Sequence, residues 1–95
     1  MDNSERHKTI CGELNALYIA KNADYGNSFD QSLDEDGLLV AKIRLGDKFS
    51  RFSTLIKQEA EVKDESLRDT LIDLANYAIM TVMWMDGENN NEKHI

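Results

Sequence analysis

Residues 74–85, Leu-Ala-Asn-Tyr-Ala-Ile-Met-Thr-Val-Met-Trp-Met, decide the fold of this chain. Asn76 and Thr81 are the only strongly polar residues in the stretch. A helix that is apolar all round must be covered on more than one side, and a 95-residue chain offers few other helices to cover it. The stretch therefore predicts an all-α fold that assembles as a homo-oligomer, with a dimer as the default.

Two upstream stretches also show helical spacing, and together with the last helix they predict three main helices in a small bundle. The third helix is expected to begin at Asp64, its natural N-cap, and to end before Gly87. The polar segment 22–35 is expected to be a binding loop. The apolar positions are Ile10, Leu14, Leu17 and Tyr18 in residues 4–22, and Ala41, Leu45, Phe49, Phe52 and Ile56 in residues 36–59.

Three smaller expectations accompany this layout. Cys11 is expected to be a small buried thiol. Gly46 lies inside the second helix and is expected to mark a close helix contact or a ligand approach. The domain is expected to span residues 1–87, with residues 88–95 as a disordered polar tail.

Composition limits the function further. Eighteen Asp and Glu against eleven Lys and Arg give a net charge of -7, which argues against direct nucleic-acid binding. The single cysteine excludes an internal disulfide and favours a reducing compartment. The first ten residues lack the apolar core of a signal peptide, and the longest apolar run, about a dozen residues, is too short to span a membrane. We therefore expect a cytoplasmic protein without a membrane partner.

Three carboxylates share one face of the predicted third helix. Glu65, Asp69 and Asp73 lie four residues apart, and each step of four advances about 400° around a helix. Like charges at this spacing repel by about 0.2–0.5 kcal/mol per pair, so the face needs compensating cations. Either the cationic strip Arg44, Lys48 and Arg51 or a bound divalent metal would supply them. Carboxylate oxygens favour Mg²⁺ or Mn²⁺, and the absence of His or Cys ligand spacing excludes zinc.

Four blocks of sequence carry a resemblance to a known family. They are residues 21–29 (KNADYGNSF), 44–51 (RLGDKFSR), 64–66 (DES) and 69–78 (DTLIDLANYA). The chain resembles the nucleotide modification associated domain family, which is associated with phage nucleotide metabolism or base modification. Its helical layout is similar to that of the MazG-like pyrophosphohydrolases, all-α enzymes that bind Mg²⁺ with acidic pairs on two helices and release pyrophosphate.

The resemblance implies a nucleotide site. Glu65, Asp69 and Asp73 would be the catalytic and metal-binding residues, with Asp47 as a further metal ligand. The pattern departs from the pyrophosphohydrolases at Thr70, which stands where they carry a second acid, and Asp47 stands alone where they carry an acidic pair. The residues expected to bind the nucleotide are Lys21, Asn22, Asp24, Tyr25, Ser28, Phe29, Arg44, Lys48, Arg51 and Asn76.

Three functions stay open at this point. The first is a Mg²⁺-dependent nucleoside triphosphate pyrophosphohydrolase, in which the cations clamp the phosphates and an aromatic side chain stacks on the base. The second is a nucleotide-binding module without turnover, in which the acids pair with the cations instead of a metal. The third is an acidic helical protein that interacts with a host partner.

Overall fold

The computed structural model describes residues 2–25, 27–58 and 60–94, and within them it describes the side chains outside residues 24–25, 60–65 and 88–94. In these residues all regular secondary structure is α-helical, in four helices: α1 (Asn3–Tyr25), α2 (Ser28–Asp36), α3 (Leu38–Leu55) and α4 (Ala60–His94). The all-α prediction is confirmed. The predicted number of three helices is wrong.

The additional helix, α2, lies in the segment that was expected to be a loop. Seven of its nine residues are polar, and this composition concealed a short apolar side formed by Phe29 and Leu33. These two residues lie four apart, as neighbours on a helix surface do, and Leu33 is fully buried. Tertiary packing of that side therefore stabilises a helix that propensity alone does not predict.

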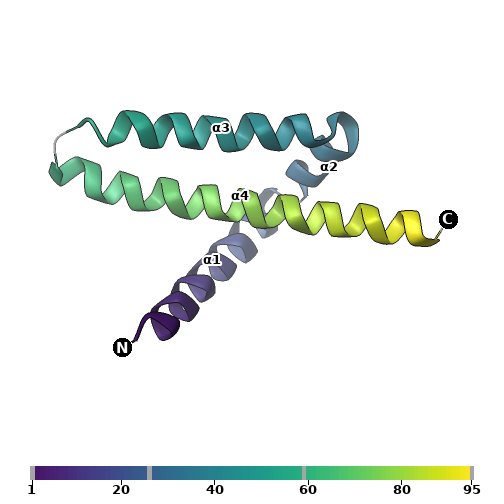
Figure 1. Cartoon of the computed structure of the whole chain (residues 1–95), viewed down its shortest axis with the longest axis horizontal. Helices are drawn as coiled ribbons and strands as arrows, with labels where there is room; N and C mark the ends of the chain where they lie inside the picture. Colours follow the sequence, from purple (N-terminus) through teal and green to yellow (C-terminus); the bar gives the residue numbers. More distant parts are fainter. Residues whose placement is uncertain (1, 26, 59, 95) are drawn as a thin grey trace.

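Helices α3 and α4 form an antiparallel pair, α1 crosses this pair at a large angle, and α2 packs beside the start of α3 (Figure 1). The short connection between α3 and α4 requires their antiparallel arrangement. The N-terminal half of α1 extends away from the other helices in the same view. The region where α1, α2 and α4 meet is therefore separate from the long α3–α4 contact.

The turn between α2 and α3 depends on glycine. Gly37 has a φ of +73°, in the left-handed region that favours glycine, and its N–H donates to the carbonyl of Leu33 at 2.7 Å. An added Cβ at Gly37 would meet nothing within 4 Å, so the backbone conformation alone imposes the requirement. At Gly46 a Cβ would likewise meet nothing within 4 Å, so the expected close helix contact there is wrong.

Several local expectations need correction. Helix α4 begins at Ala60, ahead of Asp64, and continues past Gly87 to His94. The predicted start at Asp64 and the predicted end before Gly87 are therefore both wrong. Helix α1 continues to Tyr25. Cys11 is exposed, so the expected buried thiol is wrong, and its Sγ lies 3.7 Å from Nδ1 of His7. The separation of residues 88–95 from the domain stays a prediction.

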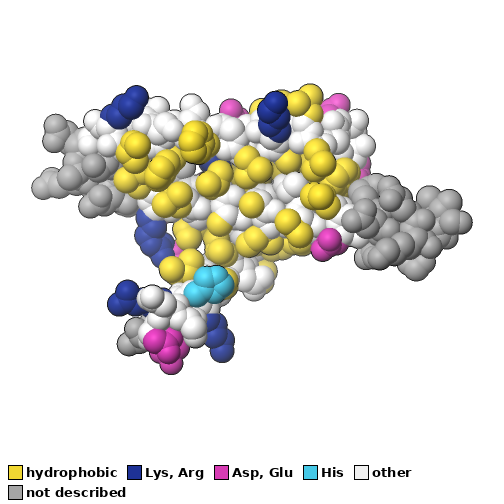
Figure 2. Space-filling model, viewed as in Figure 1, with side chains coloured by type: hydrophobic (Ala, Val, Ile, Leu, Met, Phe, Trp, Pro, Cys, Tyr) yellow, Lys and Arg dark blue, Asp and Glu magenta, His cyan; other side chains and the backbone are white. Residues whose placement is uncertain are grey.

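The predicted apolar stripe of α3 is buried only in part. Ala41 and Leu55 are buried, whereas Phe49 is 64% exposed and Ile56 is 49% exposed. Leu45 and Phe52 are half-buried, so α3 turns part of the predicted stripe, together with Leu55, away from solvent. Figure 2 shows the consequence: hydrophobic side chains spread over the visible face of α3 and α4 without a covering element.

Candidate functional site

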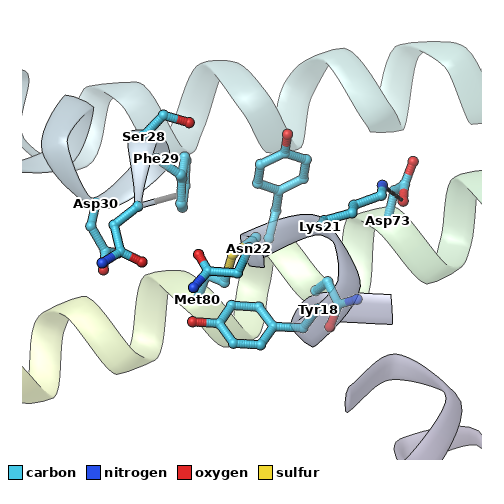
Figure 3. Close-up of a pocket in the computed structure, with 11 residues that line it drawn as sticks. Tyr18, Lys21, Asn22, Ser28, Phe29, Asp30, Asp73 and Met80 are labelled. Carbon is cyan, nitrogen blue, oxygen red and sulfur yellow. Dashed lines mark hydrogen bonds and ion pairs between the residues drawn. The ribbon is translucent and has the colours of Figure 1, made fainter. Parts of the chain in front are cut away.

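A cavity of about 260 Å³ lies where α1, α2 and α4 meet (Figure 3). Each of these helices contributes residues at helical spacing, so one side of each helix faces the same space. They are Tyr18, Lys21 and Asn22 from α1, Ser28, Phe29 and Asp30 from α2, and Asp73, Asn76, Tyr77 and Met80 from α4, with Asn27 preceding α2.

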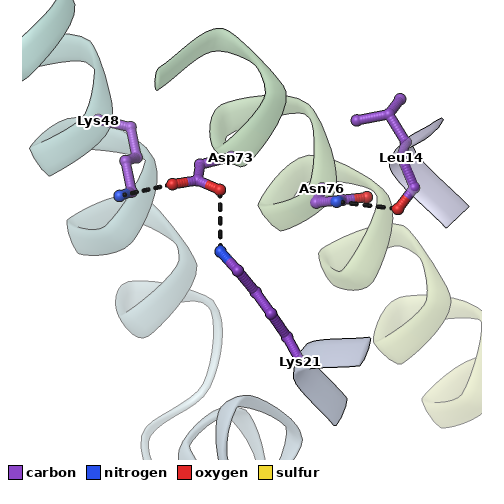
Figure 4. Close-up of polar contacts among 5 residues, drawn as sticks. All are labelled: Leu14, Lys21, Lys48, Asp73 and Asn76. Carbon is purple, nitrogen blue, oxygen red and sulfur yellow. Dashed lines mark hydrogen bonds and ion pairs between the residues drawn. The ribbon is translucent and has the colours of Figure 1, made fainter. Parts of the chain in front are cut away.

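An ion-pair cluster forms one end of the cavity. The Lys21 Nζ donates to one carboxylate oxygen of Asp73 at 3.0 Å, and the Lys48 Nζ donates to the other at 3.2 Å (Figure 4). These contacts join α1, α3 and α4 through one carboxylate. Because Lys48 and Asp73 are each about one quarter exposed, water screens their pair less than a surface salt bridge.

The two lysines determine the charge state of Asp73. Partial burial by itself would raise the pKa of the Asp73 carboxyl, but hydrogen bonds and charge attraction from Lys21 and Lys48 together outweigh burial and lower that pKa. Asp73 is therefore a carboxylate at neutral pH. Two positive charges against one negative charge leave this cluster with a surplus of one positive charge.

Asn76 positions α1 against α4. It is 8% exposed, and its Nδ2 donates to the main-chain carbonyl of Leu14 at 3.2 Å (Figure 4). Leu14 is also buried. Both groups are buried and cannot bond water, so each would be left without a hydrogen bond if the helices moved apart. This hydrogen bond therefore fixes the separation of α1 and α4.

Aromatic rings form the wall between the two ends of the cavity. Phe29 of α2 and Tyr77 of α4 pack edge to face, with ring centroids 5.0 Å apart and an angle of 71° between planes. Tyr18 of α1 contributes a third ring to the lining. The cavity thus offers apolar surface for a flat ring and, at its ends, amide, hydroxyl and charged groups that orient a ligand.

The structure brings part of the predicted site together. Six predicted residues line the cavity: Lys21, Asn22, Ser28, Phe29, Asp73 and Asn76. Lys48 reaches it indirectly, through Asp73. Asp47, Asp69, Arg44 and Arg51 are exposed and do not line it. The side chains of Asp24, Tyr25 and Glu65 lie outside the described residues.

The sequence interpretation missed Tyr18, Asn27, Asp30, Tyr77 and Met80. A usable signal was present for three of them. Tyr77 and Met80 lie four and seven residues after Asp73, and Tyr18 lies three before Lys21, so each shares a helix side with a predicted residue. Asp30 and Asn27 had no such signal, because α2 itself was not predicted.

The described side chains do not fit the predicted metal site. Both carboxylate oxygens of Asp73 already meet lysines, and among the described residues no group of three His, Cys, Asp or Glu lies close enough to hold a metal ion. Binding of Mg²⁺ stays a prediction that depends on Glu65, whose side chain is not among those described.

Most of the chain matches a known protein family. Residues 21–85, more than half of the chain, match the family described as nucleotide modification associated domain 1. The chain belongs to this family. Every residue that lines the cavity except Tyr18 falls within the matched segment of the nucleotide modification associated domain. No curated protein and no solved structure matches the chain. Within the described part of the chain, no helix is both long and apolar enough to cross a membrane.

Proposed function

We propose that this nucleotide modification associated domain binds a nucleotide, or a small molecule derived from one, in the cavity between α1, α2 and α4. The observation that carries the proposal is the combination of an aromatic wall, Phe29 and Tyr77, with a positively charged cluster at one end. Aromatic faces stack on bases, and lysine binds phosphate as a point charge. The family description, which refers to nucleotide modification, supports the same ligand class.

The geometry favours binding without turnover. A metal-dependent hydrolase needs carboxylates that are free to coordinate the ion, whereas Asp73 is engaged by Lys21 and Lys48. This arrangement is the one expected of a binding module, in which acids pair with cations. Stacking, amide contacts from Asn22 and Asn76, and the charge of Lys21 supply recognition without a metal.

Isothermal titration calorimetry in EDTA tests this function. We expect saturable binding of at least one member of a panel of nucleosides and nucleotides, with no hydrolysis of the bound compound. Asn22→Ala should weaken binding, because Asn22 lines the cavity. Asn15→Ala is the matched control, since Asn15 lies on the same helix but outside this cavity. Absence of binding by every compound would overturn the proposal.

A Mg²⁺-dependent pyrophosphohydrolase is the second candidate. Its support is the ionised Asp73 at the cavity, one helical turn from the exposed Asp69 on α4. Release of pyrophosphate from nucleoside triphosphates with Mg²⁺ or Mn²⁺ would favour this candidate, and Asp69→Asn should then abolish release. Absence of pyrophosphate across a complete panel would exclude it.

We also propose that a second copy of the chain covers the open face of α3 and α4. Nine large apolar side chains on these two helices are between 42% and 64% exposed. Two of them, Ile79 and Met83, line a hollow with α1, and Figure 2 shows hydrophobic surface continuing across α3 and α4. Patches on monomers rarely exceed about 300–600 Å². The Cα radius of gyration is 15.5 Å, compared with about 13 Å for a compact domain of 100 residues, so one copy alone is extended.

A further inference from the structure

The charged groups in and beside the cavity sum to zero, with the positive charge at one end and Asp30 as the compensating acid, and this limits the anion that the cavity accepts. Lys21, Asp30 and Asp73 line the cavity, and Lys48 pairs with Asp73 from α3. Two lysines thus face two carboxylates. The chain as a whole carries a charge of -7, so its net charge does not attract a polyanion at long range. A triphosphate with its several negative charges would find no matching set of cations among the described residues at the cavity.

The size of the cavity leads to the same limit. Its volume of about 260 Å³ lies near the lower end of small-molecule sites, which begin at about 300 Å³. The aromatic rings and the amides of Asn22 and Asn76 belong to the same lining. The cavity therefore has room for a small ligand, and a chain of three phosphates on a bound nucleoside would extend beyond it.

The two ends of the cavity differ in charge. Figure 3 shows Lys21 and Asp73 at one end and Asp30, Ser28 and Phe29 at the other, with Tyr18 between them. The Lys21 end attracts a negative group. The Asp30 carboxylate at the other end accepts hydrogen bonds, and the amino group of a base or the hydroxyl groups of a sugar would donate them.

We infer that the cavity takes a nucleoside monophosphate, with its single phosphate at Lys21 and its hydrogen-bond donors at Asp30, in preference to a nucleoside triphosphate. This inference rests on the proposed function and adds the number of phosphates and the orientation of the ligand. The phosphate binds at the Lys21–Asp73–Lys48 cluster, because this cluster has a surplus of one positive charge.

The difference in exposure between the two lysines allows Lys21 to leave Asp73 and bind a phosphate instead. The Lys21 side chain is 54% exposed, whereas that of Lys48 is 27% exposed. Exposed ion pairs contribute little to stability, so Lys21 turns toward a phosphate at small cost. Lys48 stays on Asp73 and keeps its carboxylate compensated. Lys21 is thus the phosphate-binding residue, and Lys48 is a positioning residue.

A calorimetric panel in EDTA tests the inference. The panel contains the common ribonucleosides and deoxyribonucleosides, their monophosphates and their triphosphates. We expect the preferred monophosphate to bind about tenfold more tightly than both its nucleoside and its triphosphate, a difference of about 1.4 kcal/mol in each case. Affinity that increases stepwise from nucleoside to triphosphate would overturn the inference and leave the proposed function standing. No binding by any compound would overturn both.

Variants separate the two ends of the cavity. Lys21→Met should remove about tenfold of the monophosphate affinity and leave nucleoside affinity within about twofold. Asp30→Asn should weaken the nucleoside and its monophosphate by the same factor. Lys42→Met is the matched control, because Lys42 is exposed on α3 and does not line the cavity. Equal losses of nucleoside and monophosphate affinity in Lys21→Met would contradict a phosphate at Lys21.

Discussion

At the residue scale, Asp73 is the residue on which most of the site depends. Its carboxylate connects α1 and α3 to α4 through Lys21 and Lys48, and its neighbours Asn76 and Tyr77 line the same cavity. The sequence placed Asp73 with Glu65 and Asp69 as a metal ligand. Spacing within one helix does not tell which cations the other helices bring to Asp73, and here they are Lys21 and Lys48.

Substitution of Asp73 should lower stability. Asp73→Asn leaves two lysines without their carboxylate, and we expect a loss of about 1 kcal/mol in the free energy of unfolding. Asp69→Asn is the matched control, since Asp69 is exposed one turn earlier on the same helix. Urea denaturation followed by circular dichroism measures both. An equal effect of the two substitutions would show that the lysine pairs do not contribute to stability.

The same carboxylate should make stability depend on pH. The pKa of Asp73 is lower in the folded chain than its ordinary value, so its interactions stabilise the fold above about pH 4 and are lost as the pH falls through the lowered value. Urea midpoints at several pH values should therefore decrease more steeply below about pH 4 for the unmodified chain than for Asp73→Asn. Parallel curves would contradict this assignment.

At the element scale, the sequence predicted which segments are helical better than it predicted which side of each helix is buried. Helical periodicity identified α1, α3 and α4, because stripes of apolar residues persist over many turns. The side that each helix buries was less predictable, since Phe49 and Leu55 are both apolar and only packing leaves one exposed and buries the other. Helix α2 was missed because nine mostly polar residues resemble a loop until Leu33 meets its neighbours.

Two contacts attach α1 to α4, and their contributions to stability are predicted to differ. Leu14 is buried against α4, while Glu13 makes an exposed bidentate ion pair with Arg68 of α4, one N–H···O bond of which is 2.8 Å long. Leu14→Ala should cost about 2–3 kcal/mol. Glu13→Ala should cost far less, because water screens its charge. Thermal unfolding of the two neighbouring variants compares them, and a larger effect of Glu13→Ala would contradict a mainly apolar attachment.

At the scale of the whole molecule, the exposed apolar side chains of α3 and α4 are the basis for the proposed second copy. The apolar character of residues 74–85 led to the same prediction from the sequence, since the two other predicted helices cannot easily cover such a helix. Sequence did not indicate which face would remain open, because that depends on where α1 crosses. The crossing leaves the visible face of α3 and α4 uncovered in Figure 2.

Self-association is therefore expected, and charge on this surface should prevent it. Phe49 is 64% exposed and Val82 is 55% exposed. We expect light scattering coupled to size exclusion to show a dimer for the unmodified chain and a monomer for Phe49→Glu with Val82→Glu. Lys42→Glu changes the charge of α3 at an exposed polar position and should stay dimeric. A monomeric unmodified chain would contradict the proposed second copy.

The most direct test of a nucleotide site between α1, α2 and α4 is a methyl NMR titration of the methionine-labelled chain. Met80 lines the cavity, whereas Met85 is exposed farther along α4 and does not line it. Addition of the preferred nucleoside monophosphate should shift the Met80 methyl resonance saturably and leave that of Met85 in place. A saturable shift at Met85 with none at Met80, or no shift at either, would contradict a nucleotide site in this cavity.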